Sequence, residues 1–233
     1  MTSNERDAFW SHPDQVEKFA SRAPDLRLLR LLVTYADPTS TRVLDLGCAG
    51  GRNAAALAEQ HFDLIAIDSS PAMVQKTRER LAPMMGSEEA NRRVRLGRMD
   101  DLSALRDEYF HLIVALGVFH QAASHQEWQN SLAETARVLM PQGLALVAVF
   151  TPASQPHGEP LRLLPDQPNM YDGFSSGPLH LVQPDELDRA FDALGLERVA
   201  PTEIVEIQTE QGFRVTANGL YSRRFAGRPP QQT

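Results

Sequence analysis

The 233-residue sequence lacks the features that mark a secreted, membrane-bound or nucleic-acid-binding protein. It has one cysteine, so no internal disulfide can form, which suits a reducing compartment. The first ten residues, MTSNERDAFW, are polar, and no segment approaches the roughly 20 apolar residues that a membrane span needs. Lysine and arginine number 23 against 30 acidic residues, and the formal net charge of −7 argues against binding to nucleic-acid phosphates. These absences predict a soluble, cytoplasmic protein that binds neither membrane nor nucleic acid.

The apolar residues between positions 42 and 150 alternate between strand and helix patterns. Continuous apolar runs such as LIVA at 112–115 are typical of parallel strands that are covered by helices on both faces. The pattern therefore predicts an α/β fold with a mostly parallel, doubly wound sheet. Strands are expected at 42–46, 62–67, 93–96, 110–115 and 143–150, and helices at 51–60, 70–82 and 125–139. The basic stretch NRRVR at 91–95 fits either a small positive patch or, as we prefer, a solvated approach to a strand.

The flanking segments have different patterns. Residues 13–35 predict two helices broken near Pro24, whereas residues 151–183 contain six prolines and little periodicity. After them we expect a helix at 184–194 and an antiparallel pair of strands. We expect these strands at 197–208 and 213–223, joined by a turn at 210–212.

The length of the chain fits a single domain with several parts. We expect residues 1–233 to divide into an N-terminal helical cap (13–36), a ligand-binding core (42–150), an inserted lid (151–183), a helix with a strand pair (184–224) and a disordered tail (225–233). Because proline and glycine leave few buried backbone hydrogen bonds, the inserted lid is expected to be irregular and mobile.

The most informative stretch is VLDLGCAGGRNA at 43–54, where a strand runs into small residues and then a helix. Such a turn offers free backbone N–H groups to an anionic or polar cofactor. A phosphate-binding P-loop would need Lys-Ser/Thr after the last glycine, but Arg52 and Asn53 follow. A dinucleotide loop would need a small residue where Arg52 stands. Neither loop explains why an aspartate is followed by small residues at every second position: Asp45, Gly47, Ala49 and Gly51.

That spacing resembles the D-x-G-x-G-x-G loop of class I S-adenosylmethionine-dependent methyltransferases. Two further segments are similar to this family: IAIDSSPAM at 65–73, and ETARVLMPQG at 134–143, which resembles E-x-x-R-V-L-x-P-G-G. The resemblance covers residues 13–224. It implies a Rossmann-like, seven-stranded sheet, mostly parallel with an antiparallel last strand, and helices on both faces. It also implies a transferase that uses S-adenosylmethionine.

The resemblance assigns cofactor contacts to particular residues. Asp45 is expected to hold the α-amino group, Asp68 the two ribose hydroxyls, and Arg22 the carboxylate, although a surface role for Arg22 fits equally well. A Cβ in the glycine loop would collide with the cofactor at most positions. The further cofactor positions implied by the resemblance are Gly47, Ala49, Gly51, Asn53, Ser69, Met73, Met99 and Leu116.

One departure from the family pattern concerns the adenine. Arg98 stands where the family usually has an aspartate that contacts the adenine amino group. Met99 could still hold the ring through its backbone N–H and side chain. Asp100 either replaces the missing carboxylate or, with Asp101, caps a short helix after the third strand, and both interpretations stay open.

Methyl transfer needs an aligned nucleophile and little acid–base help, so no catalytic residue is strictly required. If a base is used, His120 after the fourth strand is the first candidate, although a packed histidine bonded to backbone is the competing interpretation. His180 and Tyr171 in the inserted lid are the next candidates. No histidine shows metal-ligand spacing with cysteine or carboxylate residues, so no metal site is expected.

The expected acceptor is a small organic metabolite, because the inserted lid is apolar and aromatic rather than basic, and the protein is expected to be a monomer or homodimer. Two alternatives stay open: a non-catalytic protein that binds or senses S-adenosylmethionine or depends on a partner, and a non-methyl reaction of the same cofactor.

Overall fold

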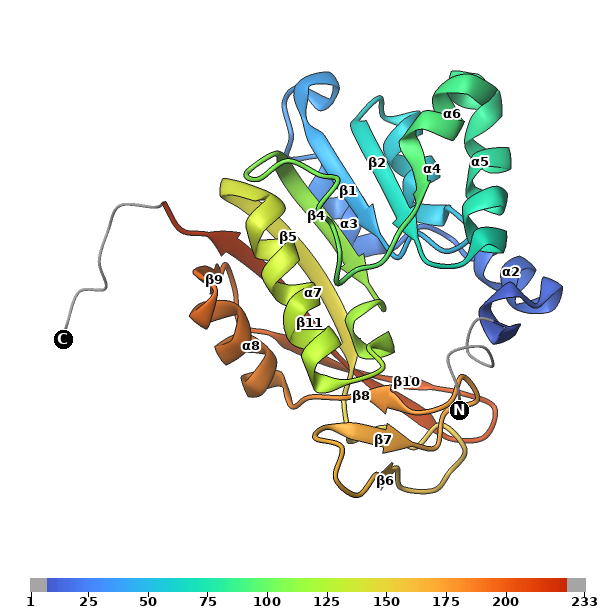
Figure 1. The fold of residues 1–233 in the computed structure, drawn as a ribbon, viewed down its shortest axis with the longest axis vertical. Helices are drawn as coiled ribbons and strands as arrows, with labels where there is room; N and C mark the ends of the chain where they lie inside the picture. Colours follow the sequence, from blue (N-terminus) through green and yellow to red (C-terminus); the bar gives the residue numbers. More distant parts are fainter. Residues whose placement is uncertain (1–7, 226–233) are drawn as a thin grey trace.

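The predicted parallel strands form one sheet in the computed structural model, which describes residues 8–225 (Figure 1). The strand order is β3-β2-β1-β4-β5-β11-β10, and β9 pairs with β11. Strands β1 to β5 are parallel to their neighbours in the sheet, and β11 runs antiparallel to β5. The strands are β1 (Arg42–Leu46), β2 (Asp63–Asp68), β3 (Val94–Leu96), β4 (Phe110–Leu116), β5 (Leu139–Phe150), β9 (Leu196–Arg198), β10 (Glu203–Gln208) and β11 (Phe213–Arg223).

Helices cover both faces of this sheet, as the doubly wound prediction requires. Figure 1 shows α7 and α8 in front of the sheet and α3 behind it. Successive residues of one strand point to opposite faces of the sheet. Leu44 packs on one face with residues of α7 and α8, and Val43 packs on the other face with residues of α3, α4 and α5. The helices are α2 (Pro13–Ala20), α3 (Leu26–Leu32), α4 (Arg52–Glu59), α5 (Pro71–Met85), α6 (Ser87–Arg93), α7 (His125–Val138) and α8 (Pro184–Ala193), with short 3₁₀ turns η1 (Pro38–Ser40) and η2 (Phe119–Gln121).

Local capping fixes where the helices begin beside the strand ends. The Ser70 hydroxyl accepts from the Met73 N–H at 3.4 Å and begins α5 directly after β2. Ser124 begins α7 in the same way, accepting from the Glu127 N–H at 3.1 Å, while the Glu127 carboxylate accepts from the Ala123 N–H at 2.9 Å. Both helices therefore start at the edge of the sheet where the parallel strands end.

The inserted lid is more ordered than the sequence predicts. It contains a three-stranded antiparallel sheet of β6 (Arg162–Leu163), β7 (Met170–Asp172) and β8 (Leu179–His180), with an apolar cluster around Phe174. These strands are two or three residues long, too short for a period of two to appear in the sequence. The base of the lid is also bonded to β11, since Gln155 and Phe213 exchange two backbone hydrogen bonds of 2.9 Å. The expectation of an irregular segment with few backbone bonds was wrong for these parts.

Three other boundaries differ from the prediction. The expected strand 197–208 divides into β9 and β10, because Pro201 lies between them and cannot donate to a ladder. Residues 87–93 form α6, which the sequence analysis missed, and residues 97–105 form turns rather than a short helix. Of the predicted tail, residues 226–233 lie outside the described residues. Among residues 8–225, no helix is both long and apolar enough to cross a membrane.

Candidate functional site

The candidate site lies at the carboxyl ends of β1, β2 and β4. The chain passes outward from β1 to β2 and β3 and then returns to β4 on the other side of β1. Ligands of open α/β sheets bind at this switch in strand order. In Figure 1, α2 and the three-stranded lid sheet both lie beyond this edge of the main sheet.

The glycine loop is held in place by the neighbouring strand and helix. The Ile67 carbonyl accepts from the N–H groups of Gly47 and Cys48, at 2.8 and 3.0 Å. The Ala49 carbonyl accepts from the Thr77 hydroxyl at 2.6 Å. Ala49 itself has a positive φ of 48°, an uncommon conformation for a residue with a side chain. The loop is thus fixed by protein contacts without any ligand.

The chain itself supplies a physical reason for two of the loop glycines. Gly47 and Gly51 have φ values of 73° and 76°, in the left-handed region that glycine tolerates best. A Cβ at Gly47 would lie 2.7 Å from Val118, and one at Gly51 would lie 2.9 Å from Thr77. Collision with other parts of the chain is therefore enough to favour glycine at both positions, and a collision with the cofactor stays a separate prediction.

Asp45, at the end of β1, is the most unusual group in the site. Its side chain is 2% exposed, and its Oδ2 atom is buried without a hydrogen-bond partner among the described residues. Burial raises the pKa of the carboxyl group to about 7, and the negative charge of Asp68 adds to this, while the positive charge of Arg52 opposes it. A buried, unpartnered carboxylate oxygen is costly by itself and fits a cationic ligand group.

Asp68, at the end of β2, joins the glycine loop to the start of α5. Its carboxylate accepts from the Ala49 N–H at 2.8 Å and from the Ser70 N–H at 2.9 Å. Burial raises the pKa of this carboxyl group, and these backbone hydrogen bonds oppose the shift. Because a carboxylate offers about four lone-pair sites, Asp68 retains capacity for two hydroxyl donors.

At the adenine side the structure rejects one of the two interpretations of Asp100. Residues 97–105 form no helix for Asp100 and Asp101 to cap, and Asp101 instead accepts from the Ser103 N–H at 3.2 Å in a turn. Asp100 pairs with Arg98 through two bonds of 2.9 and 3.1 Å. Arg98 also reaches Glu127 on α7, at 3.0 Å. An arginine–aspartate pair therefore stands where the family usually has one aspartate.

The N-terminal helices lie against the other side of the loop. The Arg22 guanidinium stacks 4.2 Å from the Phe19 ring centroid, and burial lowers its pKa, as do the positive charges of Arg52 and Arg214. The amide oxygen of Asn53 accepts from the Asp25 N–H at 3.0 Å, so this expected cofactor residue anchors the start of α3. The other expected cofactor residues differ in exposure: Met73 and Met99 are buried, Leu116 is half-buried and Ser69 is exposed.

His120 does not fit the role of general base. Its side chain is 3% exposed and stacks on Phe150 at 4.3 Å between ring centroids. Its Nδ1 accepts from the Phe150 N–H at 3.1 Å, so the neutral ring carries its proton on Nε2 and has no lone pair left. Burial, helped by the positive charge of Arg214, lowers the pKa of His120 to about 3. The competing interpretation, a packed histidine bonded to backbone, describes this residue.

His180 is also buried, at 1% exposure, and stacks on Trp128 of α7 at 4.9 Å. Its Nε2 lies 3.0 Å from Nδ1 of His125, so one proton is shared between the two rings. Burial and the neighbouring His125 lower the pKa of His180 to about 4. Tyr171 is half-buried in the apolar cluster of the lid and pairs with Leu179. Of the three expected catalytic residues, His120 and His180 are thus buried neutral rings, and Tyr171 is half-buried.

The two buried histidines lead to a pH-dependent stability. In the folded protein, both histidines have a pKa far below the value of about 6.5 that they have in the unfolded chain. Unfolding below pH 6.5 is therefore accompanied by uptake of protons. Stability is therefore lost as pH falls below 6.5, by up to about 1.4 kcal/mol per pH unit for each histidine. Asp45 acts in the opposite direction, because its raised pKa binds a proton in the folded state below pH 7.

The measurement is urea unfolding of the wild type and His120→Asn at pH 7.0 and 5.0. The asparagine Oδ1 can still accept from the Phe150 N–H but does not titrate, so the variant is expected to lose less stability on acidification. An equal loss in both proteins would contradict the assignment of His120 as a neutral, buried ring.

Sequence reasoning missed two residues that surround the site, Arg214 and His125. Arg214 on β11 lies 5.5 Å from the Phe150 ring centroid, and Phe174 of the lid stacks on that ring at 5.3 Å. His125 belongs to the pair with His180. The sequence signal for Arg214 was weak, because FRVTA at 213–217 alternates apolar and polar residues as an ordinary half-buried strand does. The contacts themselves join segments far apart in the chain.

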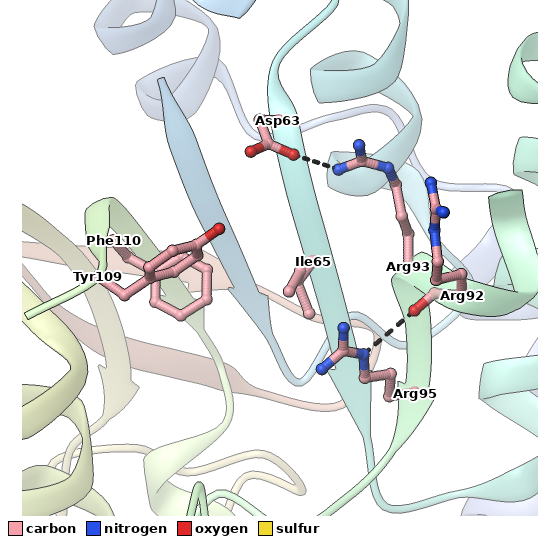
Figure 2. Close-up of a pocket in the computed structure, with 7 residues that line it drawn as sticks. All are labelled: Asp63, Ile65, Arg92, Arg93, Arg95, Tyr109 and Phe110. Carbon is pink, nitrogen blue, oxygen red and sulfur yellow. Dashed lines mark hydrogen bonds and ion pairs between the residues drawn. The ribbon is translucent and has the colours of Figure 1, made fainter. Parts of the chain in front are cut away.

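A hollow elsewhere on the surface belongs to the opposite edge of the sheet (Figure 2). It lies beside Asp63 and Phe110, the first residues of β2 and β4. Arg93 forms an ion pair with Asp63, and Arg92 and Arg93 both pair with Glu89. This basic stretch is thus largely neutralised by its own neighbours. Among residues 8–225, no three histidine, cysteine or acidic side chains gather into a group that could hold a metal ion.

Residues 43–143 match the model of a family described as a methyltransferase domain. The matched segment contains the glycine loop, Asp45, Asp68 and strands β1 to β4. A search among curated proteins finds no match.

Several solved structures share the fold. A 1,6-didemethyltoxoflavin-N1-methyltransferase from Burkholderia thailandensis, solved with 1,6-didemethyltoxoflavin and S-adenosylhomocysteine bound, is 18% identical over 95% of this chain and 88% of that chain, with a TM-score of 0.65. A SAM-dependent methyltransferase from Methanosarcina mazei is 18% identical over 83% of this chain and 97% of that chain, with a TM-score of 0.63. A Haloferax volcanii protein in complex with the Trm112 methyltransferase activator is 19% identical over 97% of this chain and 100% of that chain, with a TM-score of 0.65.

Proposed function

We propose that the chain is a class I S-adenosylmethionine-dependent methyltransferase that transfers the cofactor's methyl group to a small organic metabolite, and the methyltransferase-domain match over residues 43–143 and the shared fold support this. The observation that carries the proposal is the buried Asp45 carboxylate, whose unpartnered Oδ2 lies beside the glycine loop. A carboxylate in this position fits the α-ammonium group of S-adenosylmethionine, because a positive charge favours its ionised form.

The neighbouring residues would hold the rest of the cofactor. Asp68 keeps lone pairs for the two ribose hydroxyls, next to the loop N–H group of Ala49 that it already binds. Arg22 has no ion-pair partner among residues 8–225 and suits the cofactor's carboxylate. On the adenine side, the buried Met99 offers an apolar surface for the ring, and Asp100 is a carboxylate whose charge Arg98 already balances.

When bound, the cofactor supplies an electrophilic methyl group on a sulfonium sulfur. The chain's own task is to align an acceptor and exclude water, and such alignment alone is worth an effective molarity of about 10⁵–10⁸ M. His120 and His180 stay neutral and are poorly suited to remove a proton, because burial keeps their pKa values low. We propose that positioning carries most of the rate, with the Tyr171 hydroxyl as the remaining candidate for a polar contact to the acceptor.

A small acceptor is favoured by the side chains around the strand ends. Phe150, Phe174 and Tyr171 form an apolar wall between the main sheet and the lid sheet. The Burkholderia thailandensis protein with a similar fold is a 1,6-didemethyltoxoflavin-N1-methyltransferase solved with 1,6-didemethyltoxoflavin bound, and the match covers 95% of this chain. The net charge of −7 disfavours nucleic acid as the acceptor.

A second candidate function is that of a methyltransferase subunit that depends on a partner protein. It is favoured by the Haloferax volcanii relative, which was solved in complex with a methyltransferase activator. In that case the isolated chain would bind the cofactor and transfer no methyl group until the partner is added.

Radiolabelled methyl transfer tests the proposal. The purified protein is incubated with methyl-labelled S-adenosylmethionine and a low-molecular-weight metabolite extract, with heat-denatured protein as control. Label in a new small compound is the expected result. Binding of S-adenosylhomocysteine without any transfer would reject independent catalysis and favour the partner-dependent function.

Asp68→Ala is expected to weaken S-adenosylhomocysteine binding by about 1–3 kcal/mol, the scale for hydrogen bonds to a charged acceptor. Because Asp68 also accepts from Ala49 and Ser70, the variant should lose stability as well, unlike a purely ligand-binding residue. Calorimetric titration and urea unfolding measure the two effects. Asp101→Ala is the matched control, since Asp101 is exposed and bonded within a turn. An unchanged dissociation constant for folded Asp68→Ala would place the ribose elsewhere.

A further inference from the structure

Arg214 is a half-buried arginine without a counter-charge. Its Nε atom is buried and has no hydrogen-bond acceptor, and within residues 8–225 it forms no ion pair. Burial lowers the pKa of the guanidinium group, and no carboxylate raises it again. Arg223 on the same strand differs, because it donates to the Glu108 carboxylate at 2.9 Å and to backbone carbonyls. A buried Nε–H group without an acceptor is costly unless a ligand provides one.

The position of Arg214 links it to the acceptor side of the site. Its guanidinium lies 5.5 Å from the centroid of the Phe150 ring, which stacks on His120 at 4.3 Å and on Phe174 at 5.3 Å. These rings come from the end of β5, the turn after β4 and the lid, respectively. Arg214 therefore stands where the main sheet meets the lid sheet.

The same position separates Arg214 from Asp45, the expected contact of the cofactor's ammonium group. In the sheet, β11 is three strands from β1, which corresponds to about 14 Å at the usual strand spacing. The ammonium and carboxylate of the cofactor are neighbours on one carbon atom. The charge of Arg52 acts on Asp45, whereas the charge of Arg214 acts on Arg22 and His120. We therefore infer that Arg22 and Arg52, rather than Arg214, take the cofactor's carboxylate. A different anion is needed for Arg214.

We propose that Arg214 binds an oxyanion of the methyl acceptor, so that the acceptor is an anionic small molecule such as a carboxylate or a phosphate ester. This inference rests on the proposed function and narrows its substrate class. A guanidinium group presents its donors in a planar fork that matches the two oxygens of such a group. Phe150 and Phe174 give the apolar part of the acceptor a surface next to that charge.

The experiment uses the metabolite extract after separation by anion exchange into an anionic fraction and a combined neutral and cationic fraction. Each fraction is offered, at limiting concentration, to wild type, Arg214→Gln, Arg214→Lys and Arg189→Gln with labelled S-adenosylmethionine. Arg189→Gln is the control, because Arg189 is an exposed residue of α8 that pairs with Asp185. Calorimetric titration with S-adenosylhomocysteine is run on all four proteins.

The anionic fraction is expected to support transfer in the wild type and in Arg189→Gln. Arg214→Gln should lower the rate by at least about tenfold, as loss of a hydrogen bond between charged groups implies, and Arg214→Lys should restore part of it. The affinity for S-adenosylhomocysteine should stay within about twofold in every variant.

Three results would overturn the inference. Transfer only with the neutral and cationic fraction would leave the methyltransferase function standing and remove the anionic acceptor. Equal rates for wild type and Arg214→Gln would remove Arg214 from acceptor binding, and a loss of S-adenosylhomocysteine affinity in Arg214→Gln would assign this arginine to the cofactor's carboxylate. Transfer with neither fraction would reject the proposed function itself, together with the inference that rests on it.

Discussion

Replacement of Asp45 by asparagine is expected to weaken the binding of S-adenosylhomocysteine by about 10–100-fold, which is the loss of one hydrogen bond between charged groups. The substitution keeps the shape of the side chain and one oxygen acceptor, and removes only the charge. Because the Oδ2 atom of Asp45 has no partner among the described residues, no contact within the protein is lost with it. Calorimetric titration at pH 8 measures the effect.

The same substitution should not destabilise the cofactor-free protein. Burial raises the pKa of Asp45 to about 7, well above the unfolded value of about 3.9, so the ionised carboxylate lowers stability as pH rises from 4 to 7. Asparagine cannot ionise and escapes this loss. Above pH 7, free Asp45→Asn should therefore unfold at the same or a higher urea concentration than the wild type. A clear loss of stability at pH 8 would mean that Asp45 is mainly a structural carboxylate.

Cofactor affinity should also depend on pH through this residue. A cationic ligand group binds the ionised form of Asp45, so the affinity of the wild type should fall by up to tenfold per pH unit below about pH 7 and level off above it. Asp45→Asn should lack this part of the pH dependence. Titration of both proteins with S-adenosylhomocysteine between pH 5.5 and 8 makes the comparison, and parallel curves would contradict the role of Asp45.

The part of the site that was predictable from the sequence is the part fixed by strand topology. Asp45 and Asp68 each stand at the end of an apolar run, and adjacent parallel strands bring such ends together. The glycine loop between β1 and α4 was recognisable because its residues are consecutive in the chain. Local order along the chain was enough for these features.

The features that sequence reasoning missed depend on contacts between distant segments. The Nδ1 atom of His120 accepts from the N–H group of Phe150, 30 residues away, and the amide oxygen of Asn53 accepts from the N–H group of Asp25, 28 residues away. Neither partner can be inferred from a motif. Arg214 could not be singled out from the sequence either. It stands out because its buried Nε atom has no hydrogen-bond acceptor among the described residues, and a sequence does not show which groups lack a partner.

Gly47→Ala is expected to destabilise the protein by about 2–5 kcal/mol, the sum of a left-handed backbone cost of about 1–2 kcal/mol and an overpacking cost of about 1–3 kcal/mol. The φ of Gly47 is 73°, and the new Cβ would lie 2.7 Å from both Cβ and Cγ2 of Val118. A Cβ–Cβ contact cannot be relieved by rotating a side chain, so the loop or the turn after β4 must move. Movement of the loop would shift the N–H groups of Gly47 and Cys48 away from the Ile67 carbonyl.

Gly195→Ala separates the two costs. Gly195 has a φ of 80°, close to that of Gly47, but a Cβ there would meet no atom within 4 Å. It should therefore show only the backbone cost of about 1–2 kcal/mol and leave S-adenosylhomocysteine binding unchanged. Gly47→Ala should be the less stable variant in urea unfolding, and any folded fraction should bind S-adenosylhomocysteine more weakly than the wild type. If the two variants lose the same stability, the Val118 contact yields without cost, and φ alone requires glycine at position 47.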